Sequence, residues 1–419
     1  MNRASGFIRP PLLFLGIFFF YALSFLGAQS ESNDGNERIT GISISGLKRT
    51  RLSTAERPLQ KFIGLPADQV EEDEVRAAIL TTGVLEPLSV KAEGQTLSVE
   101  VREKWAIFPV PVVFAGSGGI LAGLAFFDAN AFGLADKFSL AGLYQSSSWA
   151  VSSGYIHLSP GGHVPGWSAM GIFSRGTQHN RDQDNNDLRR FDFDAVSLNA
   201  GLNVPLLKDS DLLSASTQLS FSDISLRNTK QALNGPDGGL RLFGAGEEIS
   251  IRKSSWDGYL FSQKAASLRY LCRMPLNSSP FQSIRFQGTW QKSLVPGFRI
   301  NLQAGLLFDP DAPILAESPP FVAEVAILPR DFSARDYAGG SAGLEKYIVK
   351  TPIGTLSVSA AYQLVFSRGS ILGTSLDHGV LGMLTFYLNR LAIPALGLGL
   401  SYNVTKNYLQ GSFALGMSF

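Results

Sequence analysis

The sequence has few cysteines, few charged residues and almost no net charge, and each shortage narrows the class of protein. A single cysteine, Cys272, among 419 residues excludes an intrachain disulfide. A formal net charge of +1 creates no strong field for an anionic polymer, so we expect no nucleic-acid partner. Charged residues make up 17% of the chain, below the roughly one quarter of ordinary soluble domains. This composition argues against a typical soluble enzyme.

Long apolar runs are missing after residue 28, so any membrane crossing beyond that point must use strands. The one long apolar stretch, residues 11–28, follows Arg3 and Arg9 and ends in small residues. This order predicts a secretory signal peptide over residues 1–28, with an uncleaved anchor as the alternative. Residues 29–37, QSESNDGNE, read as a polar linker.

Glycine, phenylalanine and a two-residue alternation are what the sequence has in abundance. There are 43 glycines and 29 phenylalanines. From residue 105 onward apolar and polar residues alternate, as where Ile284, Phe286 and Trp290 share one face of residues 282–292. A soluble β-sandwich and a transmembrane β-barrel both alternate in this way. Segments of about 10 residues, and a polar face rich in Ser, Gly and Gln, favour the barrel.

Sixteen such segments can be counted. They begin near residues 106, 118, 136, 148, 165, 190, 211, 240, 258, 282, 297, 340, 354, 377, 395 and 409, and the start near 240 has the weakest pattern. Longer connections follow odd-numbered segments, at 176–189, 227–238 and 308–339, while those after even-numbered segments are mostly short. Short periplasmic turns and longer outer loops are typical of outer-membrane barrels. We therefore predict an all-β, antiparallel barrel over residues 105–419.

A small α/β domain is predicted ahead of the barrel, over residues 38–104. The apolar spacing gives the order strand, helix, helix, strand, strand, with glycines at the helix ends. The stretches ITGISISG, TTGVLEPLSV and LSVEVREK in this order resemble one POTRA domain. An unrelated small α+β domain is the alternative.

Two stretches of the barrel resemble motifs of the BamA/TamA family of outer-membrane assembly and translocation proteins. DANAFG, with Asp128, Asn130 and Gly133, resembles that family's early turn motif. FSARDYAGGSAG resembles its loop motif: Arg335 and Tyr337 match, and Asp336 stands where glycine is usual. The resemblance implies a POTRA domain in the periplasm followed by a sixteen-strand barrel.

The family resemblance implies that the 308–339 loop folds back into the barrel and that its arginine meets acidic residues of the inner wall. Asp377 is the first candidate partner of Arg335 and Glu345 the second. Asp336 could instead pair with Arg335 locally, and an exposed loop arginine is the alternative.

The last residues alternate perfectly. Phe413, Leu415, Met417 and Phe419 fall on one face. This pattern predicts a closing strand rather than a frayed end. A terminal aromatic on such a strand resembles the β-signal by which assembly machinery recognises outer-membrane barrels.

The resemblance implies a mechanical function and no enzyme activity. The expected protein lies in the outer membrane of a diderm bacterium, contacts its lipid, and inserts barrels or translocates polypeptides, with periplasmic accessory proteins as possible partners. A two-partner secretion pore for one substrate and a passive porin or structural barrel are the alternatives. We expect no metal and no cofactor: in DQDNND, at 182–187, Asp187 occupies the position of the invariant glycine of a calcium loop, and the four histidines have no metal spacing.

Overall fold

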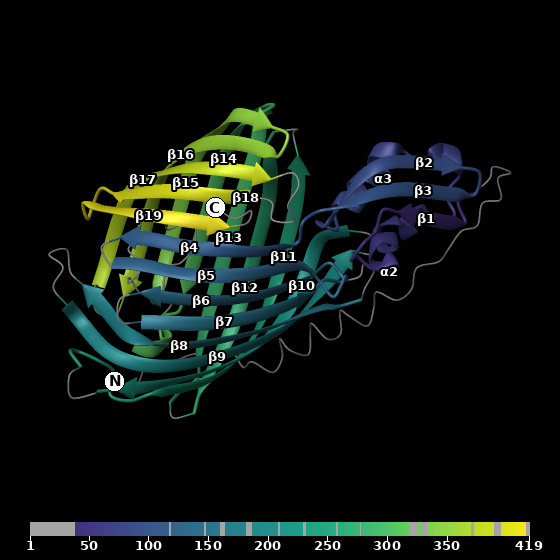
Figure 1. Cartoon of the computed structure of the whole chain (residues 1–419). Coiled ribbons are helices and arrows are strands. Elements are labelled where there is room, and N and C mark those ends of the chain that lie inside the picture. The colour runs from purple at the N-terminus through teal and green to yellow at the C-terminus, as the bar shows by residue number, and fades with distance from the viewer. Residues whose placement is uncertain are drawn as a thin grey trace.

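The computed structural model describes most of the chain beyond its first 37 residues. The described residues are 38–116, 119–145, 148–159, 164–181, 187–207, 210–228, 232–256, 259–276, 278–317, 326–328, 334–369, 373–388 and 395–415. The predicted signal peptide and linker lie outside them. The described residues form a small N-terminal domain and a large sheet that curves into a barrel (Figure 1).

The N-terminal domain has a three-stranded sheet in the order β1-β3-β2, with β1 parallel to β3. Its elements are β1 (Gly41–Ser45), α2 (Leu52–Glu56), η1 (Arg57–Phe62), η2 (Ala67–Gln69), α3 (Glu72–Leu80), β2 (Leu85–Glu93) and β3 (Thr96–Glu103). Glycines in the left-handed region follow the two helical segments, Gly64 at φ 85° and Gly83 at φ 73°. The core is a single cluster that includes Leu59, Phe62 and Ile79. None of the described helices is long and apolar enough to cross a membrane.

The predicted sixteen-strand barrel is confirmed: one antiparallel sheet contains sixteen strands in sequence order, β4 to β19. Its strands are β4 (Ile107–Gly116), β5 (Gly119–Ala131), β6 (Asp136–Gln145), β7 (Ser148–His157), β8 (Gly166–Arg181), β9 (Asp187–Leu207), β10 (Ser210–Arg227), β11 (Leu240–Trp256), β12 (Phe261–Pro275), β13 (Phe281–Val295), β14 (Phe298–Phe308), β15 (Asp336–Thr351), β16 (Gly354–Gly369), β17 (Gly373–Leu388), β18 (Ala395–Asn403) and β19 (Tyr408–Leu415). The weakest predicted segment begins at residue 240, where β11 starts.

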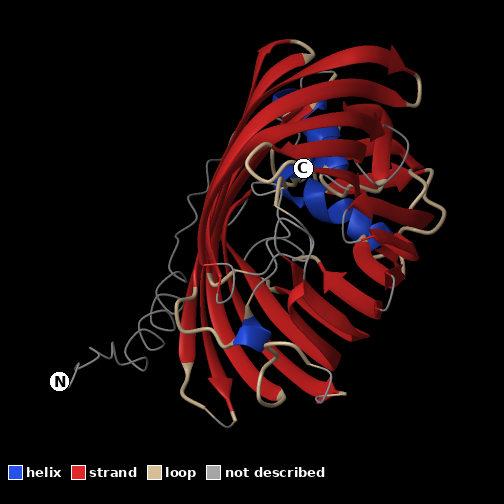
Figure 2. Ribbon diagram, turned by 90° about the vertical axis from the view of Figure 1, so that its left-hand side faces the viewer, coloured by secondary structure: helices blue, strands red, loops and turns tan. Residues whose placement is uncertain are grey.

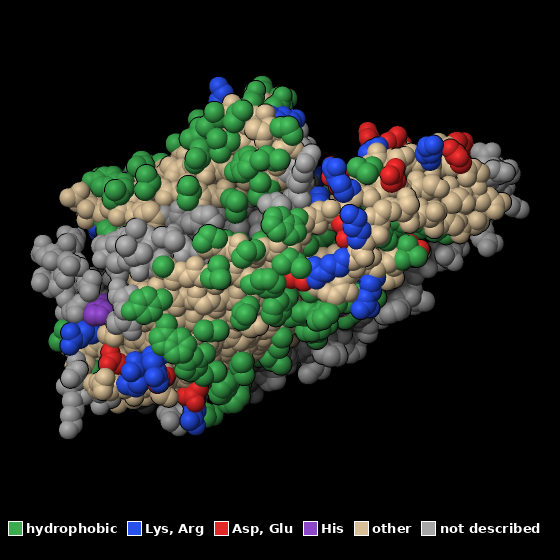
Figure 3. Space-filling model, in the orientation of Figure 1, with side chains coloured by type: hydrophobic (Ala, Val, Ile, Leu, Met, Phe, Trp, Pro, Cys, Tyr) green, Lys and Arg blue, Asp and Glu red, His purple; other side chains and the backbone are tan. Residues whose placement is uncertain are grey.

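The two faces of the sheet differ in the way that the alternation predicts. On β17, Leu376, Val380 and Leu384 are exposed, whereas Asp377 and Thr385 are buried inside the barrel. Figure 3 shows apolar side chains spread over the outer face of the barrel, with charged ones mainly at its ends and on the N-terminal domain. An apolar outer band over a polar interior is the arrangement that a lipid bilayer requires.

The barrel closes where its first and last strands meet. The ladder of the sheet begins at β4 and ends at β19, and these two strands lie side by side (Figure 1). Figure 2 looks along the barrel, where the strands curve round into a ring. We call the β4–β19 junction the seam.

Candidate functional site

The described parts of the long loop between β14 and β15 pack inside the barrel. We call residues 309–335 the plug loop; it contains η4 (Ile314–Ala316). Ile327 and Leu328 are buried, and with Leu307, Tyr337 and Val365 they belong to one apolar cluster against the inner wall. An inward-folded loop is what the family resemblance predicted.

Polar side chains of the last strands hold the buried backbone of the plug loop. The Gln363 side-chain oxygen on β16 accepts the Ile327 N–H at 3.1 Å, and Asn403 on β18 donates to the Ile327 carbonyl at 3.3 Å. The Ala326 carbonyl accepts from Ser401 at 3.0 Å and from Gln410, on the seam strand β19, at 2.7 Å. Buried backbone groups need such partners. The wall therefore fixes this segment beside the seam.

Charge also anchors the plug loop, with arginines on the wall and carboxylates on the loop. Arg273 of β12 pairs with Asp309, and its Nη1 donates to the Ala316 carbonyl at 3.3 Å. Glu317 lies between two arginines: Arg189 of β9 at 3.6 Å and Arg335 at 3.2 Å. The Glu317 side chain is 1% exposed, so these contacts operate away from water.

The predicted pairing of Arg335 with Asp377 or Glu345 is wrong. Arg335 meets Glu317 of its own loop, and the same carboxylate faces Arg189 of the inner wall. Asp377 instead accepts bonds from Ser375 (2.7 Å), Asn403 (3.2 Å) and Lys406 (3.1 Å). Through Asn403, which also bonds the loop backbone, it is linked to the plug loop.

Asp336 does not pair with Arg335 either. Its carboxylate accepts the Asp309 N–H at 2.8 Å and the Arg368 Nε–H at 2.5 Å. One residue therefore holds both ends of the plug loop to β16. The departure from the family's glycine has a structural role, since the side chain closes the loop at its base.

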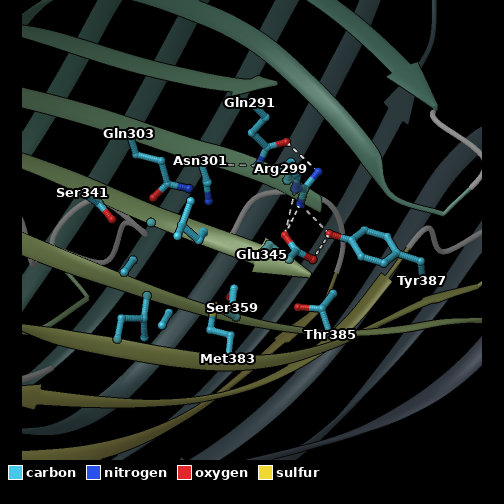
Figure 4. Close-up of a pocket in the computed structure, with 15 residues that line it drawn as sticks. Gln291, Arg299, Asn301, Gln303, Ser341, Glu345, Ser359, Met383, Thr385 and Tyr387 are labelled. Atoms are coloured by element: carbon cyan, nitrogen blue, oxygen red, sulfur yellow. Dashed lines mark hydrogen bonds and ion pairs between the residues drawn. The ribbon is translucent and has the colours of Figure 1, made fainter. Parts of the chain in front are cut away.

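Glu345 belongs to a separate buried network on the inner wall. Arg299 Nε lies 2.9 Å from the Glu345 carboxylate, and the Tyr387 hydroxyl donates to the same carboxylate at 2.8 Å. Figure 4 shows Arg299, Glu345, Tyr387 and Gln291 turned toward one another from different strands. The adjoining pocket holds about 20 Å³, room for about one water molecule. Ligand pockets are more than tenfold larger, so this network ties strands together instead of forming a binding site.

The turn motif joins the barrel to the N-terminal domain. Asp128 forms an ion pair with Arg49, with Nη1 at 3.1 Å from Oδ1. Asn130 accepts the Ala135 N–H and donates to the Thr50 hydroxyl, both at 2.9 Å. The Gly133 carbonyl accepts the Arg51 N–H at 2.9 Å. All three motif residues therefore face the segment that follows β1.

A carboxylate from β3 shapes the other side of this junction. Glu103 Oε1 accepts three consecutive backbone N–H groups, from Lys48 (2.8 Å), Arg49 (2.9 Å) and Thr50 (2.7 Å). Partial burial acts to raise the pKa of Glu103, but the three bonds outweigh it and hold that pKa below its usual range. The segment that meets the barrel is thus fixed from within the N-terminal domain.

The C-terminal strand is only partly described. Phe413 and Leu415 lie on β19 opposite Leu398 and Leu396 of β18. Met417 and Phe419 lie outside the described residues, as does the DQDNND stretch apart from Asp187. Among the residues that the structure describes, no group of His, Cys, Asp and Glu could hold a metal ion.

Sequence reasoning missed the residues that complete these sites. Glu317 carries no motif, and its position between two arginines depends on how the plug loop folds. Arg49 lies 79 residues before its partner Asp128 in the sequence, and Thr50 lies 80 residues before Asn130. A basic residue in the segment that follows β1 does not by itself indicate a contact with the barrel. Gln410 and Asn403 belong to no motif that the sequence displays.

No protein-family model and no curated protein matches the sequence. Solved structures do match. BamA from Haemophilus ducreyi, lacking POTRA domains 1–3, is 12% identical with a TM-score of 0.54, over 90% of this chain and 84% of that one. CdiB from Acinetobacter baumannii is 15% identical with a TM-score of 0.58, over 92% and 74%. The chain has the fold of the BamA and CdiB barrels. CdiB from Escherichia coli agrees, at 12% identity and a TM-score of 0.52, over 94% and 93% of the two chains.

Proposed function

We propose that this protein is an outer-membrane barrel that inserts or translocates polypeptides and has no enzyme activity. Residues 1–28 direct it to the periplasm, residues 38–104 form a POTRA-like domain there, and residues 105–419 form the barrel. The apolar outer face, the sixteen strands and the BamA- and CdiB-like fold support this placement. Function then rests on what the plug loop, the junction and the seam can do.

The observation that carries the proposal is the plug loop. Its ends and centre are held by the pairs Asp309–Arg273, Asp336–Arg368 and Glu317–Arg189. Ion pairs in an enclosed space are costly to break singly but can exchange partners when a charged chain enters. A loop fastened this way suits a barrel that opens for a polypeptide. A passive porin needs a permanently wide lumen, so we place it last.

The POTRA-like domain provides a second argument. In its β1-β3-β2 sheet, β2 is an edge strand. An extended client segment can bind such an edge through main-chain hydrogen bonds. The turn at Asp128 and Gly133 fixes this domain to the barrel, and so keeps a captured client close to the lumen and the seam.

One feature favours a dedicated secretion pore as the specific role. Ahead of the barrel the described residues contain one POTRA-like domain, fewer than general assembly factors usually carry. A single receiving module suits one substrate better than many. The second candidate is therefore a two-partner secretion pore.

Depletion of the protein, followed by quantification of the outer-membrane and secreted proteomes, tests the proposal. Loss of many barrel proteins indicates insertion, and loss of one secreted protein indicates a dedicated pore. Complementation with wild type and with Glu317→Gln shows whether the plug loop matters. If neither proteome changes while small-solute uptake falls, the passive porin replaces the proposal.

A further inference from the structure

The backbone of β4 presents its odd-numbered residues to the seam. The Ala129 N–H donates to the Ala106 carbonyl at 2.8 Å. These residues continue the β4–β5 register in which Ile107 lies opposite Asp128. In an antiparallel ladder, residues alternate between bonding one neighbour and the other. Even-numbered residues of β4 therefore bond to β5, and odd-numbered ones direct their backbone groups toward β19.

Two of those odd-numbered positions are proline. The positions directed at the seam are Ile107, Pro109, Pro111, Val113 and Ala115. Proline has no N–H, so this edge offers five carbonyls but only three donors, and the two missing donors are adjacent in the ladder. The register of β4 with β5 passes through both prolines without a bulge, which is possible because neither needs a donor on that side.

The edge of β19 has all of its backbone donors and acceptors. The Val404 N–H donates to the His378 carbonyl at 2.8 Å, which continues the β17–β18 register. By the same alternation, odd-numbered residues of β18 bond to even-numbered residues of β19. The seam-directed positions of β19 are then Leu409, Gly411, Phe413 and Leu415. Each has both an N–H and a carbonyl.

We propose that the seam is asymmetric: β4 is blunted by Pro109 and Pro111, and a client strand that enters the seam pairs with β19. Prolines on an edge strand are a common means of discouraging strand addition. A strand added to β4 would leave two of its own carbonyls without donors in a lipid environment, which is unfavourable. A strand added to β19 finds a partner for every group. This inference rests on the proposed function, because it needs a polypeptide client.

The plug loop makes β19 the controlled edge as well. Gln410, an even-numbered residue whose side chain is buried, donates to the Ala326 carbonyl of the plug loop at 2.7 Å. The strand that we assign to the client is thus the strand that the loop holds. Release of the loop and exposure of the β19 edge are then linked by one side chain.

A photoreactive peptide tests the choice of edge. The probe has the sequence of β13, residues 281–295, which has no native partner at the seam, and carries a benzophenone at position 286. It is added to the full chain in lipid nanodiscs, and cross-links are mapped by mass spectrometry. We expect products on β19 to exceed those on β4 at least about fivefold, the effect of about two hydrogen bonds at the low end of their range.

The double variant Pro109→Ala/Pro111→Ala restores the two donors and should bring the ratio toward one. Val113→Ala, also directed at the seam, leaves the donors unchanged and is the matched control; heat-modifiable migration on gels shows that all variants fold. A wild-type preference for β4, or a ratio that the double variant does not move, overturns the inference. Cross-linking at neither edge also overturns it, while a proteome effect on depletion would still leave translocation through the lumen standing.

Discussion

Arg49 of the N-terminal domain and Asp128 at the end of β5 form an ion pair that joins the two parts of the molecule. The same Asp128 carboxylate accepts the Asn130 N–H at 2.9 Å, so one side chain shapes the turn and holds its partner. The Arg49 side chain is 38% exposed, and a pair this accessible contributes only about 1 kcal/mol or less. The junction therefore depends on the sum of several contacts, with the turn geometry at its centre.

Gly133→Ala should loosen this junction. Gly133 has φ 75°, a conformation that costs an L-residue roughly 1–2 kcal/mol. An added Cβ would also lie 2.3 Å from the Arg49 carbonyl oxygen, so the N-terminal domain must shift. We expect a broader distance distribution between spin labels on β2 and on the rim of the barrel, measured by pulsed electron resonance.

Gly142→Ala is the matched control for that measurement. Gly142 lies on β6, and a Cβ there would meet nothing within 4 Å. Its distance distribution should equal that of wild type. An unchanged distribution in Gly133→Ala would show that the turn does not set the position of the domain.

Glu317→Gln should release the plug loop. Glu317 is buried between Arg189 and Arg335, and its neutralisation removes a negative charge beside the Arg189 guanidinium, whose side chain is 4% exposed. Breaking one side of a buried pair costs about 3 kcal/mol or more, equivalent to about a 100-fold rise in the released population. Planar-bilayer recordings should show frequent large openings that are rare in wild type.

Asp223→Asn controls for loss of a carboxylate outside the plug loop. Asp223 pairs with Arg241 between β10 and β11, and the Arg241 side chain is 61% exposed. Its conductance should match wild type. Equal conductance of Glu317→Gln and wild type would mean that the ion pairs of Glu317 do not keep the loop in place.

The strands could be predicted closely because alternation is a local signal. Every predicted start lies within four residues of the observed one, and the largest differences are at β15 (336 against 340) and β17 (373 against 377). The side chains of a strand that face lipid must be apolar along its whole length. A few residues therefore suffice to show which alternate positions of the strand face lipid. The helices of the N-terminal domain also end where their glycines indicated.

The partners of the site residues could not be predicted in the same way. Arg335 could be identified as a loop residue, but whether it meets Asp377, Glu345 or Glu317 depends on how the plug loop descends. That path is set by contacts such as Gln410 to Ala326, which join positions 84 residues apart. The family resemblance implied that Asp377 and Glu345 lie on the inner wall, but not that Lys406, in the turn between β18 and β19, and Arg299, on β14, pair with them.

Replacing one residue of the Arg299–Glu345 pair should destabilise the barrel strongly, whereas replacing both residues together should cost less. Both side chains are 4% exposed, so Glu345→Gln leaves a buried charge and should destabilise the barrel by about 3 kcal/mol. The double variant Arg299→Met/Glu345→Gln removes both charges and should be milder than the sum of the single variants. The temperature at which folded migration on gels is lost measures this.

Glu248→Gln is the comparison for the Arg299–Glu345 cycle. Glu248 pairs with Arg269 on β11 and β12, and the Arg269 side chain is 36% exposed. Its loss should lower the transition temperature only slightly, because solvent screens the pair. Additive single effects at Arg299 and Glu345 would show that the two residues do not act as a unit.

The contribution of Glu103 to the stability of the N-terminal domain should be lost as the pH falls. Its pKa lies below the ordinary value of 4.5, so the ionised carboxylate stabilises the folded N-terminal domain. That stabilisation is complete above the unfolded-state pKa and is lost as pH falls through the lower folded-state pKa. The backbone amides of Lys48, Arg49 and Thr50 donate to Glu103. They should therefore stay protected from hydrogen exchange from neutral pH down to about 4.5 and lose protection only below it.

Glu103→Gln separates this effect from general acid unfolding. The glutamine oxygen is a weaker acceptor than a carboxylate, so protection of the three amides should already be reduced at neutral pH, with little further dependence on pH. Glu100→Gln, an exposed residue on the same strand, should behave like wild type. Because Arg49 and Thr50 also contact Asp128 and Asn130 of the barrel turn, a released Lys48–Thr50 segment should also increase domain motion. If Glu103→Gln kept full protection at neutral pH, the three bonds would not be what orders this segment, and the junction would have to be fixed from the barrel side alone.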